Sequence, residues 1–93
     1  MKESELERIL VRRVRAAGGR AVKWTAPGEA GVPDRIVLLP DGRIAFVEMK
    51  APGGRLAPLQ VRWARILQEM GHRHYTIDSR EAIDRFVQEE LPE

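Results

Sequence analysis

Three charged residues near the middle of the chain have the types and spacing of a hydrolytic metal site. Asp34 follows a proline, and Glu48 and Lys50 lie two residues apart at the end of an apolar run. Side chains alternate along a strand, so Glu48 and Lys50 are expected on the same face. Oxygen ligands suit a hard cation such as Mg²⁺ or Mn²⁺, and Asp34, Glu48 and the backbone carbonyl of Met49 could supply them.

A cation held beside a lysine in this way is suited to the hydrolysis of phosphodiester bonds. The cation polarises a phosphate oxygen and lowers the pKa of a bound water. Lys50 can orient that water and offset the charge that develops on phosphorus. Each piece alone is a weak signal, because Pro-Asp is common in turns and Glu-x-Lys is often a solvated ion pair. However, Glu48 ends the apolar run 44–47. It should be partly buried there, which costs free energy unless a cation or donor compensates.

A hairpin must bring these residues together. Apolar runs at 36–39 and 44–49 flank Pro40-Asp41-Gly42-Arg43, whose composition is typical of a tight turn. In an antiparallel pair, the end of the second arm returns beside the start of the first, where Asp34 lies. Apart from Glu48, both runs are apolar, which predicts a sheet covered on both faces.

The remaining elements follow from periodicity and turn residues. Helical spacing of apolar residues predicts helices over 4–17, 58–70 and 79–90, and strands are expected over 20–25 and 73–77. The helix between the third and fourth strands implies that this pair is parallel, with a right-handed crossover. The predicted fold is α/β: an αβββαβ core with a mixed four-stranded sheet flanked by helices, a C-terminal helix, and one domain over residues 1–93. For the second helix, the expected buried stripe is Leu59, Trp63, Ile66, Leu67 and Met70. Asp78 or Ser79 is expected to cap the last helix.

Composition narrows the class of protein. The chain has no cysteine, which excludes disulfides, thiolate zinc sites and cysteine nucleophiles. Acidic residues near the N-terminus do not fit a signal peptide, and no apolar run approaches the ~20 residues of a membrane span. We therefore expect a cytoplasmic protein with no membrane partner and no small-molecule cofactor.

Charge is unevenly distributed although the net charge is only +2. Residues 2–23 hold seven basic side chains and three acidic ones, whereas residues 80–93 hold two basic and five acidic. A basic side fits a polyanionic partner, because Lys and Arg supply most of the sequence-independent affinity for nucleic acids. A solvated helix face explains the same pattern.

Three stretches closely resemble the VRR-NUC family of PD-(D/E)XK nucleases, in particular its small stand-alone members from phages and bacteria. They are 31–37 (GVPDRIV), 46–54 (FVEMKAPGG) and 56–60 (LAPLQ). The resemblance spans roughly residues 3 to 80, and the predicted element order agrees with the family's core. It implies Mg²⁺- or Mn²⁺-dependent cleavage of DNA, often branched or flapped, by a homodimer in a bacterial or phage-infected cell.

The resemblance also adds residues to the site. It places Gln60 close to the metal and its water, and it implies a metal-binding glutamate on the first helix. Among the acids there we favour Glu7, with Glu5 as the alternative. Four basic side chains are candidate DNA contacts: Arg55, which follows Lys50 in the next loop, and Lys23, Arg35 and Arg62. Trp24 is more simply explained by core packing than by base stacking, and the pair His72 and His74 lacks a third metal ligand.

Two hypotheses from different classes remain. The first is a metal-dependent endonuclease that selects branched DNA, such as a Holliday junction or a flap, and acts as a homodimer. The second is a non-catalytic module that binds nucleic acid or assembles with a partner while retaining the nuclease fold. The intact Asp34, Glu48 and Lys50 favour the first. A small-molecule enzyme lacks support, because the chain has no Gly-rich phosphate loop, nucleophile elbow or zinc signature.

Overall fold

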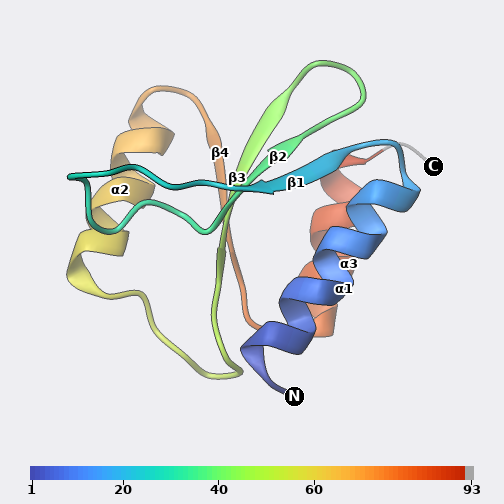
Figure 1. Ribbon diagram of the computed structural model, residues 1–93, viewed down its shortest axis with the longest axis horizontal. Coiled ribbons are helices and arrows are strands. Elements are labelled where there is room, and N and C mark those ends of the chain that lie inside the picture. Colours follow the sequence, from blue (N-terminus) through green and yellow to red (C-terminus); the bar gives the residue numbers. More distant parts are fainter. Residues whose placement is uncertain (92–93) are drawn as a thin grey trace.

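The computed structural model describes residues 1–91 and contains a four-stranded sheet with helices on both sides (Figure 1). In chain order the elements are α1 (Glu3–Ala16), β1 (Arg20–Lys23), β2 (Arg35–Leu38), β3 (Ile44–Met49), α2 (Pro58–Glu69), β4 (Arg73–Ile77) and α3 (Arg80–Glu90). The predicted fold class and element order are confirmed, with bounds within about two residues.

The sheet has the order β1-β2-β3-β4. β1 and β2 are antiparallel, as are β2 and β3, and β3 runs parallel to β4. The turn between β2 and β3 therefore forms the expected hairpin. The parallel pair is joined through α2, as a crossover connection requires.

The main core lies between the sheet and the helices α1 and α3, which lie together on one side of it (Figure 1). Its largest buried side chains include Leu6 and Leu10 from α1 and Phe86 and Ile83 from α3. These residues recur at helical spacing, so one stripe of each helix faces the sheet. Ser79 caps α3, because its Oγ accepts a hydrogen bond from the backbone N–H of Ala82 at 3.1 Å.

Helix α2 covers the opposite face of the sheet through a small aromatic cluster. The ring of Trp24 lies 5.3 Å from that of Phe46 and 5.9 Å from that of Trp63. Trp24 is thus packed against the sheet, as expected. Two members of the predicted stripe are wrong: Leu59 is 48% exposed and Met70 is 61% exposed. They lie at the two ends of α2, whereas Ala64 and Leu67 in its middle are buried.

The face under α2 is covered only in part. Val22, Leu38 and Ile44 share this face in the strand register, and each is 40–43% exposed. The sheet is therefore fully covered on the side of α1 and α3, and an apolar strip of β1, β2 and β3 stays open on the other.

A buried carboxylate holds the end of α3 in place. The side chain of Glu90 is fully buried and lies 2.6 Å from Arg43 Nη1 and 3.0 Å from Arg73 Nε. The hydroxyl of Tyr75 also donates to it. Burial raises the pKa of Tyr75, and hydrogen bonds from its hydroxyl to Glu90 and Glu89 raise it further. The cluster joins the hairpin turn, β4 and α3.

No helix within residues 1–91 is both long enough and apolar enough to cross a membrane.

Candidate active site

The β2–β3 register brings Asp34 and Glu48 together at one end of the sheet. Arg35 pairs with Val47, so the residue before the first lies opposite the residue after the second. Two hydrogen bonds hold Asp34 there. Its backbone oxygen accepts from Trp24 N–H at 3.0 Å, and its side-chain Oδ2 accepts from Met49 N–H at 2.8 Å. The predicted convergence of the two carboxylates is present.

Glu48 is a buried acid with an unsatisfied oxygen. The residue is 2% exposed, and its Oε2 has no hydrogen-bond partner within the described residues. Burial raises the pKa of Glu48 to about 8, with further contributions from a hydrogen bond to Asp34 and from the charge of Asp34. The carboxyl is therefore mainly protonated at neutral pH in the metal-free protein.

Lys50 completes the cluster from the end of β3. Its backbone N–H donates to Ile77 O at 2.9 Å, which ties the end of β3 to the end of β4. Its charge lowers the pKa of Glu48 and so opposes the effect of burial. The loop that follows folds closely over it, because a Cβ added at Gly54 would lie 3.4 Å from Lys50 Cβ and 2.9 Å from the backbone oxygen of Ala51.

The acids of α1 divide into three different roles. The carboxylate of Glu7 lies 2.7 Å from Arg35 Nε, and Glu5 Oε1 accepts from the backbone N–H of Lys2 at 3.0 Å. Glu3 is the α1 acid whose charge contributes to the raised pKa of Glu48. Glu7 is thus paired with Arg35, the neighbour of Asp34, and its role as the α1 acid of the site stays a prediction. Glu3 and Glu7 lie one helical turn apart, so spacing alone could not separate them.

Arg35 is the least exposed of the four candidate DNA contacts. Its side chain is 15% exposed, and its Nη1 donates to the backbone oxygen of Ala21 at 3.0 Å. The strand register turns it toward α1, where Glu7 engages it, so its role as a phosphate contact stays a prediction. Lys23, Arg55 and Arg62 are exposed.

Gln60 lies in the first turn of α2, and its amide oxygen accepts from Ala57 N–H at 2.8 Å. The side chain therefore caps the helix in this structure. The loop that leads to Asp34 packs closely on the same turn: Gly31 has a φ of +92°, and a Cβ there would lie 2.5 Å from the backbone oxygen of Leu59. Glycine permits this contact, which couples the positions of Asp34 and Gln60.

The two histidines have structural surroundings. The ring of His72 lies 5.2 Å from Phe46 in an edge-on arrangement. Burial lowers the pKa of His74. Within residues 1–91 no group of three His, Cys, Asp or Glu side chains has the geometry of a metal site.

The residues present nevertheless fit a hard divalent cation. Mg²⁺ keeps several of its waters and is commonly held by only one or two protein carboxylates. Asp34 and Glu48 supply two, and the buried Oε2 of Glu48 has an unmet need for a partner. Burying such an oxygen is costly unless a donor or cation satisfies it. This orphaned oxygen is the observation that makes the cluster a candidate metal centre.

Comparisons with known proteins agree with the fold and with the family resemblance. The model of the VRR-NUC domain matches residues 1–81. A protein of Acyrthosiphon pisum secondary endosymbiont phage 1, described as "Putative nuclease p44", is 46% identical over 81 residues, which is 87% of each chain. A solved structure described as "VRR_NUC domain" superposes with a TM-score of 0.88 at 29% identity, covering 95% of this chain and 96% of that one.

Proposed function

Because this chain belongs to the VRR-NUC domain family and is thereby a nuclease, we propose that it is a metal-dependent endonuclease that hydrolyses phosphodiester bonds in DNA. The observation that carries the proposal is the pairing of a partly exposed Asp34 with a buried Glu48 beside Lys50, with Glu48 Oε2 unpartnered. The proposed substrate is branched DNA, such as a Holliday junction or a flap, and the proposed active form is a homodimer.

Asp34, Glu48 and the backbone carbonyl of Met49 are the proposed ligands for Mg²⁺ or Mn²⁺. The bound cation would polarise a phosphate oxygen and acidify a water molecule. Glu7 stays the proposed contribution of helix α1 to the same centre, with Glu5 as the alternative. Glu7 holds Arg35, the neighbour of Asp34, and so positions the start of β2.

Lys50 supplies the positive charge that does not depend on the metal. As the phosphate is attacked, negative charge grows on its oxygens, and a fixed ammonium nearby stabilises that charge more than it stabilises the ground state. The ammonium can also hold the attacking water by a hydrogen bond. Gln60 is proposed to assist in orienting that water, from the first turn of α2.

The open apolar strip supports the homodimer. Val22, Leu38 and Ile44 stay about 40% exposed on one face of the sheet, and contiguous exposed apolar surface is characteristic of interfaces. A two-fold pair presents the same surface on both subunits and carries two cleavage sites, which suits a two-fold branched substrate. Sedimentation of the wild type and of Leu38→Glu tests this, with a dimeric mass expected for the first and a monomeric mass for the second. A monomeric wild type would refute the dimer.

Cleavage of defined DNA tests the nuclease itself. A labelled four-way junction, a flap and a linear duplex are incubated with Mg²⁺, Mn²⁺ or a chelator, using wild type, Asp34→Ala and the exposed-loop control Glu29→Gln. We expect cut junction or flap with either metal, no product with the chelator or Asp34→Ala, and DNA affinity nearly unchanged in Asp34→Ala. Binding without cleavage of any DNA under any metal would support the non-catalytic module instead. Equal activity of Asp34→Ala and wild type would remove the site assignment.

A further inference from the structure

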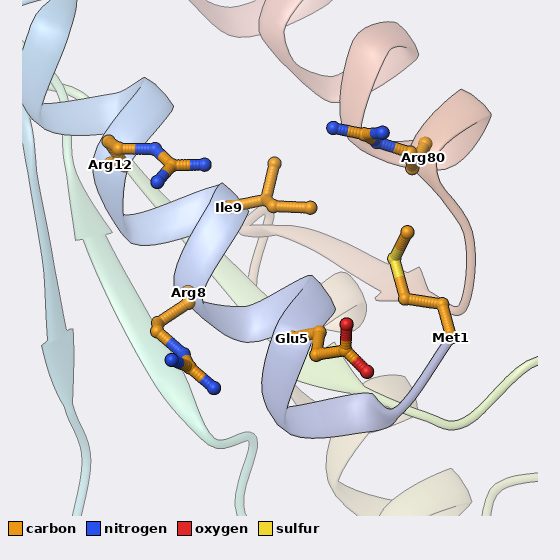
Figure 2. Close-up of a pocket in the computed structure, with 6 residues that line it drawn as sticks. All are labelled: Met1, Glu5, Arg8, Ile9, Arg12 and Arg80. Atoms are coloured by element: carbon orange, nitrogen blue, oxygen red, sulfur yellow. The ribbon is translucent and has the colours of Figure 1, made fainter.

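A hollow of about 340 Å³ lies between α1 and the start of α3, outside the carboxylate cluster (Figure 2). It is lined by Met1, Glu5, Arg8, Ile9, Arg12 and Arg80. This volume lies at the small end of the range in which proteins bind ligands.

The hollow carries excess positive charge. Three guanidinium groups and one carboxylate line it, and the Glu5 carboxylate already accepts from the backbone of Lys2. Within residues 1–91 the three lining arginines form no ion pair, whereas their neighbour Arg13 pairs with Asp84. In Figure 2 Arg12 and Arg80 extend toward each other on either side of Ile9. Like charges that converge without a counter-ion favour the binding of an anion.

The hollow belongs to the same end of the molecule as the candidate active site. Ile77 O accepts from Lys50 N–H, and Arg80 follows Ile77 by three residues, at the first position of α3. Helix α1 packs against β3, the strand that carries Glu48. Arg8 and Arg12 follow further along α1, about 6 Å apart at 1.5 Å per residue. A nucleic-acid strand that leaves the carboxylate cluster along α1 would meet these arginines in turn.

We propose that this hollow binds a backbone phosphate of the DNA strand whose neighbouring phosphodiester occupies the active site. The inference rests on the proposed nuclease function and extends it to a second contact on the substrate. Guanidinium groups match phosphate oxygens in two-point geometry, and the positive end of the α3 dipole adds to the attraction. A phosphate contact positions the strand and carries no base sequence, so the contact favours shape over sequence.

The test compares two double variants that remove equal charge from the same two helices. Arg12→Gln/Arg80→Gln empties the hollow of its facing guanidiniums, and Arg15→Gln/Arg85→Gln is the matched control. All binding is measured with a labelled four-way junction in the Asp34→Ala background, over a range of salt concentrations. We expect the first variant to weaken binding about tenfold more than the control. The salt dependence, log Kd against log salt, should fall by about 1 to 2 in slope. Equal losses in both variants would overturn the proposal.

Inorganic phosphate and a dinucleotide separate backbone phosphate from a free phosphate ligand. At constant ionic strength, each should displace the junction from wild type only weakly, because it competes for one contact among several. Selective displacement from wild type, with equal junction affinity in the two double variants, would assign the hollow to a small ligand and reject the strand contact. Failure of the nuclease proposal is a different result: wild type would not cleave, whatever these binding data show.

Discussion

The buried carboxyl of Glu48 predicts that Glu48→Gln makes the protein more stable in alkaline solution while it abolishes cleavage. Burial raises the pKa of Glu48 from its ordinary value of 4.5 to about 8. The folded protein then keeps a proton that the unfolded chain has lost, so stability is fully present below about pH 4.5 and is lost as the pH rises toward 8. At 1.36 kcal/mol per pH unit, the difference of about 3.5 units sets an upper limit of about 5 kcal/mol.

The measurement is urea unfolding at pH 5, 7 and 9 in the presence of a chelator. Subtracting wild type from Glu48→Gln cancels the other titrating groups. The stability advantage of the variant should grow by about 4 kcal/mol between pH 5 and pH 9. The exposed-loop variant Glu29→Gln should show no such growth. In an Asp34→Asn background, the growth of this stability difference between pH 5 and pH 9 should be smaller but still present, because burial is the largest cause of the raised pKa of Glu48.

Adding Mg²⁺ at pH 8 should stabilise wild type and leave Glu48→Gln nearly unchanged, since a cation that binds only the folded state adds to its stability. A stability difference between Glu48→Gln and wild type that stays constant from pH 5 to pH 9 would refute the reasoning. It would mean that Glu48 is solvated in the folded protein, and the case for a compensating cation would fall with it.

Three further substitutions test other parts of the structure. Lys50→Met should reduce single-turnover cleavage of a four-way junction by about 10²-fold or more with little change in Kd, because Lys50 acts on charge that develops in the transition state; an unchanged rate would contradict its role. Glu90→Gln should lower the free energy of unfolding by about 1 to 2 kcal/mol in urea titrations, because it weakens the hydrogen bonds of a buried group to two partly exposed arginines. Glu89→Gln loses only an exposed hydrogen bond and should cost well under 1 kcal/mol; equal midpoints would count against the cluster. Gly31→Ala should lower Tm clearly more than Gly28→Ala. Both glycines have a positive φ, but a Cβ at position 31 would also collide with the backbone of α2. Equal shifts in Tm would show that the loop is not packed as described.

Periodicity and turn chemistry were sufficient to predict the elements of this fold. The pattern of Pro40 to Arg43 between two apolar runs predicted the hairpin, and the hairpin predicted that Asp34 would meet Glu48. That step is robust because strand side chains alternate, so a slip of one residue would move Glu48 to the other face. The same alternation places Glu48 on the face of the sheet that carries Phe46.

Features that depend on tertiary contacts could not be predicted in the same way. The sequence favoured Glu7 among the acids of α1 but could not show that Arg35 would pair with it. Arg35 was one of four basic candidates for a DNA contact, and only the strand register shows that it faces α1. Periodicity likewise overestimated the burial of Leu59, because it reports the face of a helix and not where the sheet beneath it ends.

The cost of burying Glu48 helps to explain why the site lies at the end of the pairing between β2 and β3. A carboxyl with a pKa of about 8 lowers stability at neutral pH, so a folded chain selected for stability alone would carry a glutamine there. The fold tolerates Glu48 at this position because the backbone N–H of Met49 holds the Asp34 carboxylate. Lys50, two residues after Glu48, adds a positive charge. Metal binding would convert this unfavourable burial into binding energy, because the cation takes the place of the proton and satisfies Oε2. On this reasoning metal affinity should rise with pH up to about 8, and the stability lost in the metal-free protein should reappear as affinity for the metal.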